Sequence, residues 1–148
     1  MKKLISQTKR AYLAGFLDGD GSIYVRLKPN RTYKFGFQVA PYIVLFQSQK
    51  DQKNFQQLCS IINLGYMRVR KDGILEYIIG RMDNITKFIK LVEPYVILKK
   101  SQIGLLKRII IAKNKVQTKS DFMVLAKSVD TFRELNYSKK RKVRTLTP

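Results

Sequence analysis

The segment LAGFLDGDG, residues 13–21, constrains the fold more than any other part of the chain. The surrounding apolar residues predict a helix over residues 8–20, although each glycine inside a short helix costs about 1 kcal/mol relative to alanine. Ala11, Gly15 and Gly19 recur every four residues and form a stripe of small side chains along one side of that helix. Such a stripe lets a second helix backbone approach closely. We infer that the helix packs on a twin, with Ala11, Gly15 and Gly19 in the dimer interface.

Two acidic residues stand near the end of this predicted helix. Asp18 and Asp20 lie about 200° apart around the helix axis, so one chain cannot easily direct both carboxylates at one ion. Asp20 follows Gly19, whose backbone carbonyl is accessible, and this pair of oxygens suits a hard cation such as Mg²⁺. A twin helix would bring a second Asp20, as metal-assisted phosphodiester hydrolysis requires. The alternative is that DGDG is only a helix C-cap and turn.

The charge balance and the absence of histidine limit the possible chemistry. The 148 residues include 30 Lys and Arg, 10 Asp and Glu, no His and one Cys, for a formal charge of +20. A Ser-His-Asp triad, a histidine metal ligand, an intrachain disulfide and a Cys-rich zinc site are therefore excluded. The basic residues run through the whole chain and not along one amphipathic helix, which favours nucleic acid over a membrane surface as the partner.

The sequence pattern predicts neither a membrane span nor a signal peptide. No apolar run approaches the ~18–20 residues of a membrane span, and residues 1–7 lack the apolar region of a signal peptide. We therefore expect no membrane partner and an intracellular protein, in the cytoplasm and nucleoid or in an organelle matrix, that is not secreted.

The hydrophobic periodicity predicts an α+β fold in one domain, residues 1–148. Residues 22–28 alternate strictly, with Ile23, Val25 and Leu27 on one face, and so predict a strand. Two successive α-β-β units predict a four-stranded antiparallel sheet within an α-β-β-α-β-β-α core. After the first strand come a turn at 29–32, a strand at 33–48, a helix from 52 to Gly65, a hairpin of 66–70 and 74–80, a helix ending at Glu93-Pro94, C-terminal helices at 97–116 and 120–135, and a basic tail at 136–148.

The motif at residues 13–21 resembles the signature of the LAGLIDADG homing endonucleases. The resemblance continues through SIYVRLKPN and the order of helices and strands to the basic tail, and the single motif resembles the homodimeric, intron-encoded branch. It implies a metal-dependent enzyme that hydrolyses both strands of a long pseudo-palindromic double-stranded DNA target and leaves 3′ overhangs. It also implies Mg²⁺ as the cofactor, with Mn²⁺ or Ca²⁺ able to replace it in binding.

The resemblance also assigns site residues. Asp20 and the carbonyl of Gly19 would hold the metal, and Asp18 would be structural. Gln49, Lys53 and Lys99 would line the cleavage site with Asp20 and order solvent around the scissile phosphate. Gln47, Lys50 and Lys100 compete for these three positions, so the choice stays open.

The outer face of the predicted sheet supplies candidates for base recognition. Arginine can pair with guanine, asparagine or glutamine with adenine, and glutamate can accept from cytosine. Glu76 has the alternative of pairing with Arg68 across the sheet, while Val44 and Phe46 are apolar where a polar reader is expected. The predicted DNA-binding residues are Tyr24, Arg26, Lys28, Asn30, Thr32, Gln38, Arg68, Arg70 and Glu76, with Lys139, Lys140 and Lys142 on phosphate or serving only as a solubilising tail.

Two rival functions explain part of the pattern. A non-cleaving DNA-binding protein or an RNA maturase could share the fold, although the presence of Asp20 together with Gln49, Lys53 and Lys99 favours a nuclease. A basic RNA-binding protein of the ribosomal kind explains the charge, but it leaves the stripe and the two acids unexplained.

Overall fold

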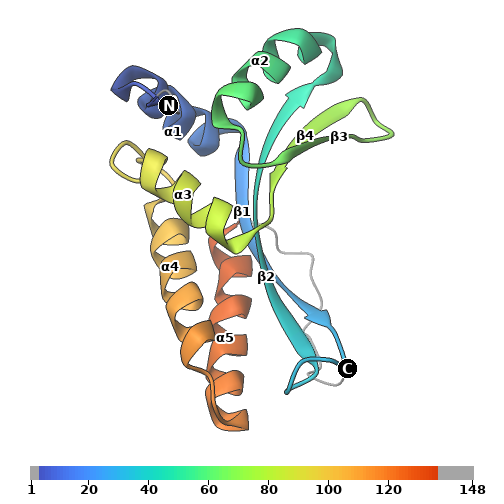
Figure 1. The fold of residues 1–148 in the computed structure, drawn as a ribbon, viewed down its shortest axis with the longest axis vertical. Helices are drawn as coiled ribbons and strands as arrows, with labels where there is room; N and C mark the ends of the chain where they lie inside the picture. Colours follow the sequence, from blue (N-terminus) through green and yellow to red (C-terminus); the bar gives the residue numbers. More distant parts are fainter. Residues whose placement is uncertain (1–3, 137–148) are drawn as a thin grey trace. The chain divides into compact units, whose positions relative to one another are not determined.

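The computed structural model describes residues 4–136 and has ten elements (Figure 1). These are helix α1 (Gln7–Asp20), strands β1 (Gly21–Pro29) and β2 (Phe37–Ser48), the short 3-10 helix η1 (Gln49–Asp51), α2 (Gln52–Ile62), β3 (Tyr66–Val69), β4 (Ile74–Ile79), α3 (Met82–Val92), α4 (Lys100–Lys115) and α5 (Lys119–Leu135). The strands form one antiparallel sheet in the order β1-β2-β4-β3. The predicted α+β class, with its sheet and its C-terminal helices, is confirmed.

The chain divides into two compact units, which we describe separately. Unit 1 comprises Met1–Ile23 and Tyr42–Lys100, and unit 2 comprises Tyr24–Pro41 and Ser101–Pro148, so the division passes through β1 and β2. The single domain expected for residues 1–148 stays a prediction, and residues 137–148 of the basic tail lie outside the described residues. Between residues 4 and 136 no helix is both long and apolar enough to cross a membrane.

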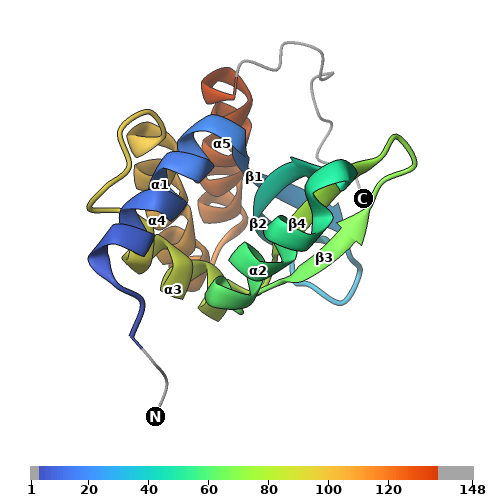
Figure 2. The same ribbon diagram turned by 90° about the horizontal axis from the view of Figure 1, so that it is seen from above.

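Unit 1 contains α1, α2 and α3 together with β3, β4 and the second part of β2. Helices α1 and α3 lie side by side (Figure 2). The Arg10 side chain joins them, donating from Nε to the Leu91 carbonyl at 2.9 Å and from Nη2 to the Lys90 carbonyl at 3.0 Å. Phe16 of α1 stacks on Phe55 of α2, with ring centroids 6.0 Å apart. These contacts fix α1 within a core that includes the fully buried side chains of Leu13, Leu17, Ile43, Leu45, Leu75, Ile79, Ile85 and Phe88.

Unit 2 contains α4 and α5 with the rest of β1 and β2 and the turn between them. Phe122 of α5 stacks on Phe35 and Phe37, at centroid distances of 5.4 and 6.1 Å. A capping box of Thr118 and Asp121 begins α5, and the backbone N–H groups of Gln117 and Thr118 lower the pKa of the Asp121 carboxyl. The capping box and the stack of aromatic rings together fix the orientation of α5 within this unit.

Three predicted boundaries were wrong. The first turn extends to Gly36, which adopts φ 78° and accepts the Asn30 N–H at 2.8 Å, so β2 begins at Phe37 and not at Tyr33. Helix α2 ends at Ile62, because Asn63 adopts the left-handed conformation before Gly65 is reached. Helix α4 begins at Lys100 and not at Ile97. At the first two boundaries a local backbone conformation overrides the hydrophobic pattern, whereas before α4 the Asp18 side chain binds the N–H groups of Ile97 and Leu98.

Candidate active site

The end of α1 holds Asp20 at a sharp junction with β1. The N–H of Gly21 donates to the Leu17 carbonyl and closes the last turn of the helix. A Cβ at Gly21 would lie 2.7 Å from the Leu17 side chain, so only glycine fits as the chain turns into the strand. Asp20 is consequently exposed at a fixed point between two regular elements.

Asp18, to which the resemblance assigns a structural role, binds the backbone that precedes α4. Its Oδ2 accepts the backbone N–H of Ile97 at 2.8 Å and of Leu98 at 3.0 Å, and its Oδ1 accepts the N–H of Lys99 at 3.1 Å. The Nζ of Lys99 in turn donates to the Asp18 carbonyl at 3.3 Å. Lys99 is therefore held at the end of α1 that carries Asp20.

The other predicted catalytic residues belong to the segment after β2. Gln49 opens η1, is exposed and donates its N–H to the Gly73 carbonyl at 2.9 Å. Lys53 is exposed in the first turn of α2, the helix that Phe55 joins to α1. Among residues 4–136, no described hydrogen bond joins Gln49 or Lys53 to Asp20.

The competing residues are Gln47, Lys50 and Lys100. Gln47 is half-buried, and its Oε1 accepts the Ser48 N–H at 2.8 Å. Lys50 and Lys100 are both exposed. Within residues 4–136, no described hydrogen bond joins Gln47, Lys50 or Lys100 to α1, whereas Lys99 is bonded to Asp18.

The oxygen donors at this point suit a hard cation but are incomplete in one chain. Asp20 offers an exposed carboxylate, and apart from its chain neighbours and the backbone of its own helix nothing lies within 4 Å of where a Gly19 Cβ would be. In the described part of the chain, no three His, Cys, Asp or Glu side chains gather in a metal-binding group. An octahedral Mg²⁺ would need further oxygens from a second copy, from nucleic acid or from water.

The stripe of small residues on α1 is uncovered in the single chain. Ala11, Gly15 and Gly19 are all exposed, and a Cβ built at Gly15 would meet nothing within 4 Å. The exposed large apolar side chains of the same unit include Tyr12, at 60%, and Ile97 and Leu98, at 73% each. Because no contact within the described chain explains the two helical glycines, the stripe is available to a second helix.

Strand β1 and its turn have the pattern expected of a recognition surface. Ile23, Val25 and Leu27 are buried, whereas Tyr24 is half-buried and Arg26 and Lys28 are exposed. The Arg26 guanidinium lies 5.5 Å from the centroid of the Tyr24 ring.

The turn residues bond to each other. The Asn30 Oδ1 accepts from the N–H and the hydroxyl of Thr32, at 3.0 and 2.7 Å. Gln38 is half-buried on β2. The turn therefore presents Asn30 and Thr32 as one hydrogen-bonded pair.

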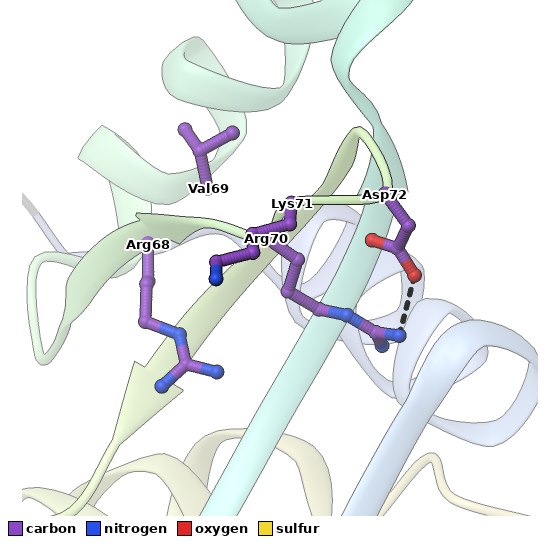
Figure 3. A pocket seen from close by; sticks show the side chains of 5 residues that line it. All are labelled: Arg68, Val69, Arg70, Lys71 and Asp72. Carbon is purple, nitrogen blue, oxygen red and sulfur yellow. Dashed lines mark hydrogen bonds and ion pairs between the residues drawn. The ribbon is translucent and has the colours of Figure 1, made fainter.

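The β3–β4 hairpin carries the other predicted readers. Arg68 and Arg70 project from the same side of the hairpin, opposite Val69, and with Asp72 they line a surface hollow (Figure 3). Glu76 pairs with Arg68 at 3.0 Å, so the predicted alternative of a cross-sheet ion pair is present. Asp72 pairs with Arg70 at 2.6 Å. The position of Asp72 in the turn, two residues after Arg70, is the signal in the sequence that points to this pair.

The centre of β2 offers no polar reader. Val44 is only 2% exposed, and Phe46 is half-buried and lies opposite Glu76. The tail residues predicted to contact phosphate, Lys139, Lys140 and Lys142, lie outside the described residues.

Comparison with known proteins decides the family. A family model described as LAGLIDADG endonuclease matches residues 13–112. This chain belongs to the LAGLIDADG endonuclease family. The family and the enzyme class predicted from the sequence are thereby confirmed.

Characterised LAGLIDADG relatives match over nearly the whole chain. Identity is 36% over 140 residues to DNA endonuclease I-CreI of Chlamydomonas reinhardtii, covering 92% of this chain and 83% of that protein. Identity is 29% over 137 residues to DNA endonuclease I-CvuI of Chlorella vulgaris, covering 93% and 85%. A crystal structure of I-CvuI with its DNA target superposes with a TM-score of 0.83 over 93% of this chain and 87% of that one.

Proposed function

We propose that this LAGLIDADG protein is a homodimeric homing endonuclease that binds a long, two-fold symmetric site in double-stranded DNA and hydrolyses both strands. The observation that carries the proposal is the exposed Asp20 at the end of an uncovered small-residue stripe. Its relatives I-CreI and I-CvuI are DNA endonucleases, and I-CvuI has been crystallised on DNA targets in the presence of Mg or Ca.

The dimer completes the candidate active site. Packing of α1 on its twin along Ala11, Gly15 and Gly19 would bring two copies of Asp20 to one axis, since Asp20 follows the stripe directly. A two-fold dimer presents the same groups to both strands of a two-fold site. The symmetry of the protein thus accounts for a pseudo-palindromic target.

The proposed cofactor is a divalent cation, Mg²⁺ by preference, with Mn²⁺ or Ca²⁺ able to replace it in binding. Asp20 and the Gly19 carbonyl would hold it, and when bound it stabilises the charge on the attacking and leaving oxygens. Lys99, held beside this point by Asp18, places its amine next to the scissile phosphate. Gln49 and Lys53 order the water there in this proposal.

Binding rests on the basic faces of the protein. The outward residues of β1 and of the β3–β4 hairpin contact base edges, and other basic residues, including Lys139, Lys140 and Lys142, contact phosphate. Cleavage leaves 3′ overhangs. The protein acts inside the cell, where its DNA substrate is found.

The test compares the wild type with Asp20→Asn on a randomised palindromic DNA library in Mg²⁺, with sequencing of new ends. We expect ends clustered at one long symmetric site with the wild type and none with the variant, which should still bind that site. An unchanged cleavage rate in Asp20→Asn would refute the active-site assignment. A site that the wild type enriches but never cuts would instead support the non-cleaving DNA-binding protein or maturase.

A further inference from the structure

The turn between β1 and β2, residues 30–36, fixes its own shape through backbone hydrogen bonds. The Tyr33 N–H donates to the Asn30 carbonyl at 3.1 Å, the Gly36 N–H to the Tyr33 carbonyl at 3.0 Å, and the Asn30 N–H to the Gly36 carbonyl at 2.8 Å. The side chains of Asn30 and Thr32 add the pair described above. These bonds join residues of the turn to each other, so they set its conformation but not its orientation within unit 2.

Lys34 and Phe35 attach this turn to the start of α5. The Phe35 ring stacks on Phe122 of α5, with the ring centroids 5.4 Å apart and the planes 20° from parallel. The Lys34 Nζ donates to the Gln117 carbonyl at 2.9 Å and lies 5.4 Å from the centroid of the Phe35 ring. The ammonium is thus directed at a carbonyl and at an aromatic face, both of which attract a cation. The turn and the helix are therefore joined by an apolar and a polar contact side by side.

The carbonyl that Lys34 binds is itself held in place. Gln117 lies in the connection between α4 and α5, and its carbonyl belongs to the same planar peptide unit as the Thr118 N–H. That N–H donates to Asp121 Oδ2 at 3.1 Å, and the Gln117 N–H donates to the same oxygen at 3.1 Å. The Asp121 N–H returns to the Thr118 hydroxyl at 3.1 Å, which completes the capping box. A capped helix end is thus the support to which the Lys34 ammonium is tied.

A turn that reads bases needs such support. The amide of Asn30 pairs with adenine only when its plane is aligned with the base edge. Groups on loops keep that precision when surrounding contacts lock the loop. Lys34 is exposed, but to bind a DNA phosphate its ammonium would have to release the Gln117 carbonyl. The contacts of Lys34 therefore favour support of the turn over neutralisation of a phosphate.

We propose that Lys34 is a positioning residue that holds the β1–β2 turn in register with DNA and is not a phosphate ligand. Gln117 and Asp121 then influence base preference through Lys34, although neither reads a base. The inference rests on the proposed function, a DNA-binding homodimer, in which Asn30 and Thr32 of the turn contact bases. It predicts that specificity at the base pairs read by the turn depends on the connection between α4 and α5.

The experiment selects a randomised palindromic DNA library for binding in Ca²⁺ and sequences the bound DNA. Asn30→Ala identifies the base pairs that the turn reads, as those whose preference it weakens. We expect the wild type to prefer one base there by about tenfold, as a bidentate contact gives. Lys34→Met keeps the length of the side chain and removes the ammonium, so it should reduce the preference several-fold at these base pairs and leave the others unchanged. Lys34→Arg retains a donor and should keep most of the preference.

Asp121→Asn separates support from charge. It removes a negative charge, which by electrostatics alone strengthens DNA binding. It also loosens the peptide unit that Lys34 binds, so we expect it to weaken the same base preferences as Lys34→Met. The melting temperature of each variant shows whether it is folded.

Arg31→Gln is the matched control for Lys34→Met. It removes one positive charge from the same exposed turn, and within residues 4–136 none of the described contacts between the turn and α5 involves Arg31. It should leave the base preferences of the turn intact.

The salt dependence of binding distinguishes the two roles of Lys34. Each phosphate contact contributes about 0.9 to the slope of log binding constant against log salt concentration, so the loss of one contact in each protomer would change the slope by about 1.8. A positioning role predicts that Lys34→Met has the slope of the wild type.

Four results would overturn the inference and leave the proposed function standing. A change of slope near 1.8 in Lys34→Met would show that Lys34 is a phosphate ligand. Base preferences that survive both Lys34→Met and Asp121→Asn would show that the turn needs no support. Preferences lost equally in Arg31→Gln would trace the effect to charge, and an Asn30→Ala variant with every preference intact would show that the turn reads no base. A wild-type protein that enriches no DNA sequence would instead overturn the proposed function, and this inference with it.

Discussion

Replacement of Asp18 by asparagine tests the division of labour between the two acids of the motif. The Asp18 carboxylate accepts three consecutive backbone N–H groups, from Ile97, Leu98 and Lys99, at 2.8 to 3.1 Å. An amide has one acceptor oxygen, so at least one of these groups would face an N–H₂ donor. We expect Asp18→Asn to destabilise the fold.

The size of the effect follows from the burial of the three bonds. Loss of the part-buried bond to the Lys99 N–H costs about 1.5 kcal/mol, and weakening the two exposed bonds from a charged to a neutral acceptor costs about 0.5 kcal/mol each. The free energy of unfolding should therefore fall by about 2.5 kcal/mol. For a chain near 150 residues this lowers the melting temperature by roughly 8 °C.

Differential scanning calorimetry at fixed protein concentration measures this change, and fixed concentration matters because a dimer is stabilised by mass action. Asp20→Asn is the matched control. Asp20 is exposed and accepts none of the described hydrogen bonds, so the melting temperature of the Asp20→Asn variant should stay within about 1 °C of the wild type. Equal melting temperatures for Asp18→Asn and the wild type would refute the structural role of Asp18.

Three other predictions concern the dimer, the DNA and the core. Gly15→Leu should yield a folded monomer by analytical ultracentrifugation, because the space beside Gly15 is open in the single chain. Gly65→Ala is the control for Gly15→Leu. A Cβ at Gly65 would clash with the Ile78 carbonyl, so this variant should have a lower melting temperature but the same sedimenting mass as the wild type. DNA affinity should fall steeply as salt rises, because many phosphate contacts give a steep slope of log binding constant against log salt concentration. An affinity that does not change with salt would contradict binding through basic residues. Burial raises the pKa of the Cys59 thiol to about 12, so iodoacetamide at pH 8 should alkylate Cys59 only after unfolding, and rapid alkylation of the folded protein would contradict its burial.

The fold was predictable where hydrophobic periodicity alone sets the structure. The strict alternation of residues 22–28 gave β1 correctly. The same rule misled at Tyr33, Phe35 and Phe37, which also alternate but belong partly to a turn closed by the Asn30 N–H and the Gly36 carbonyl. Phe35 packs on Phe122 without belonging to a strand, whereas Phe37 is the first residue of β2.

Only those residues of the candidate site that lie next to one another in the sequence could be placed from the sequence. Gly19 and Asp20 follow from a contiguous motif, whereas the position of Lys99 depends on hydrogen bonds to a residue 81 positions away. The apolar Ile97 and Leu98 suggested a longer helix, because the sequence does not reveal that Asp18 binds their N–H groups. The pairing of Glu76 with Arg68 similarly depends on strand register, which periodicity leaves undetermined.

The hydrogen bond from the Gln49 N–H to the Gly73 carbonyl limits how the β3–β4 hairpin can be redesigned. Its turn is short, with the Gly73 N–H donating to the Arg70 carbonyl at 3.1 Å and Gly73 itself at φ 81°. A longer grafted loop would withdraw the carbonyl that anchors Gln49 and release the start of η1. In the proposed function, new DNA specificities are therefore accessible through side-chain exchange at fixed loop length, whereas insertions between Arg70 and Ile74 would disturb the proposed base-reading residues and the segment that carries Gln49 together.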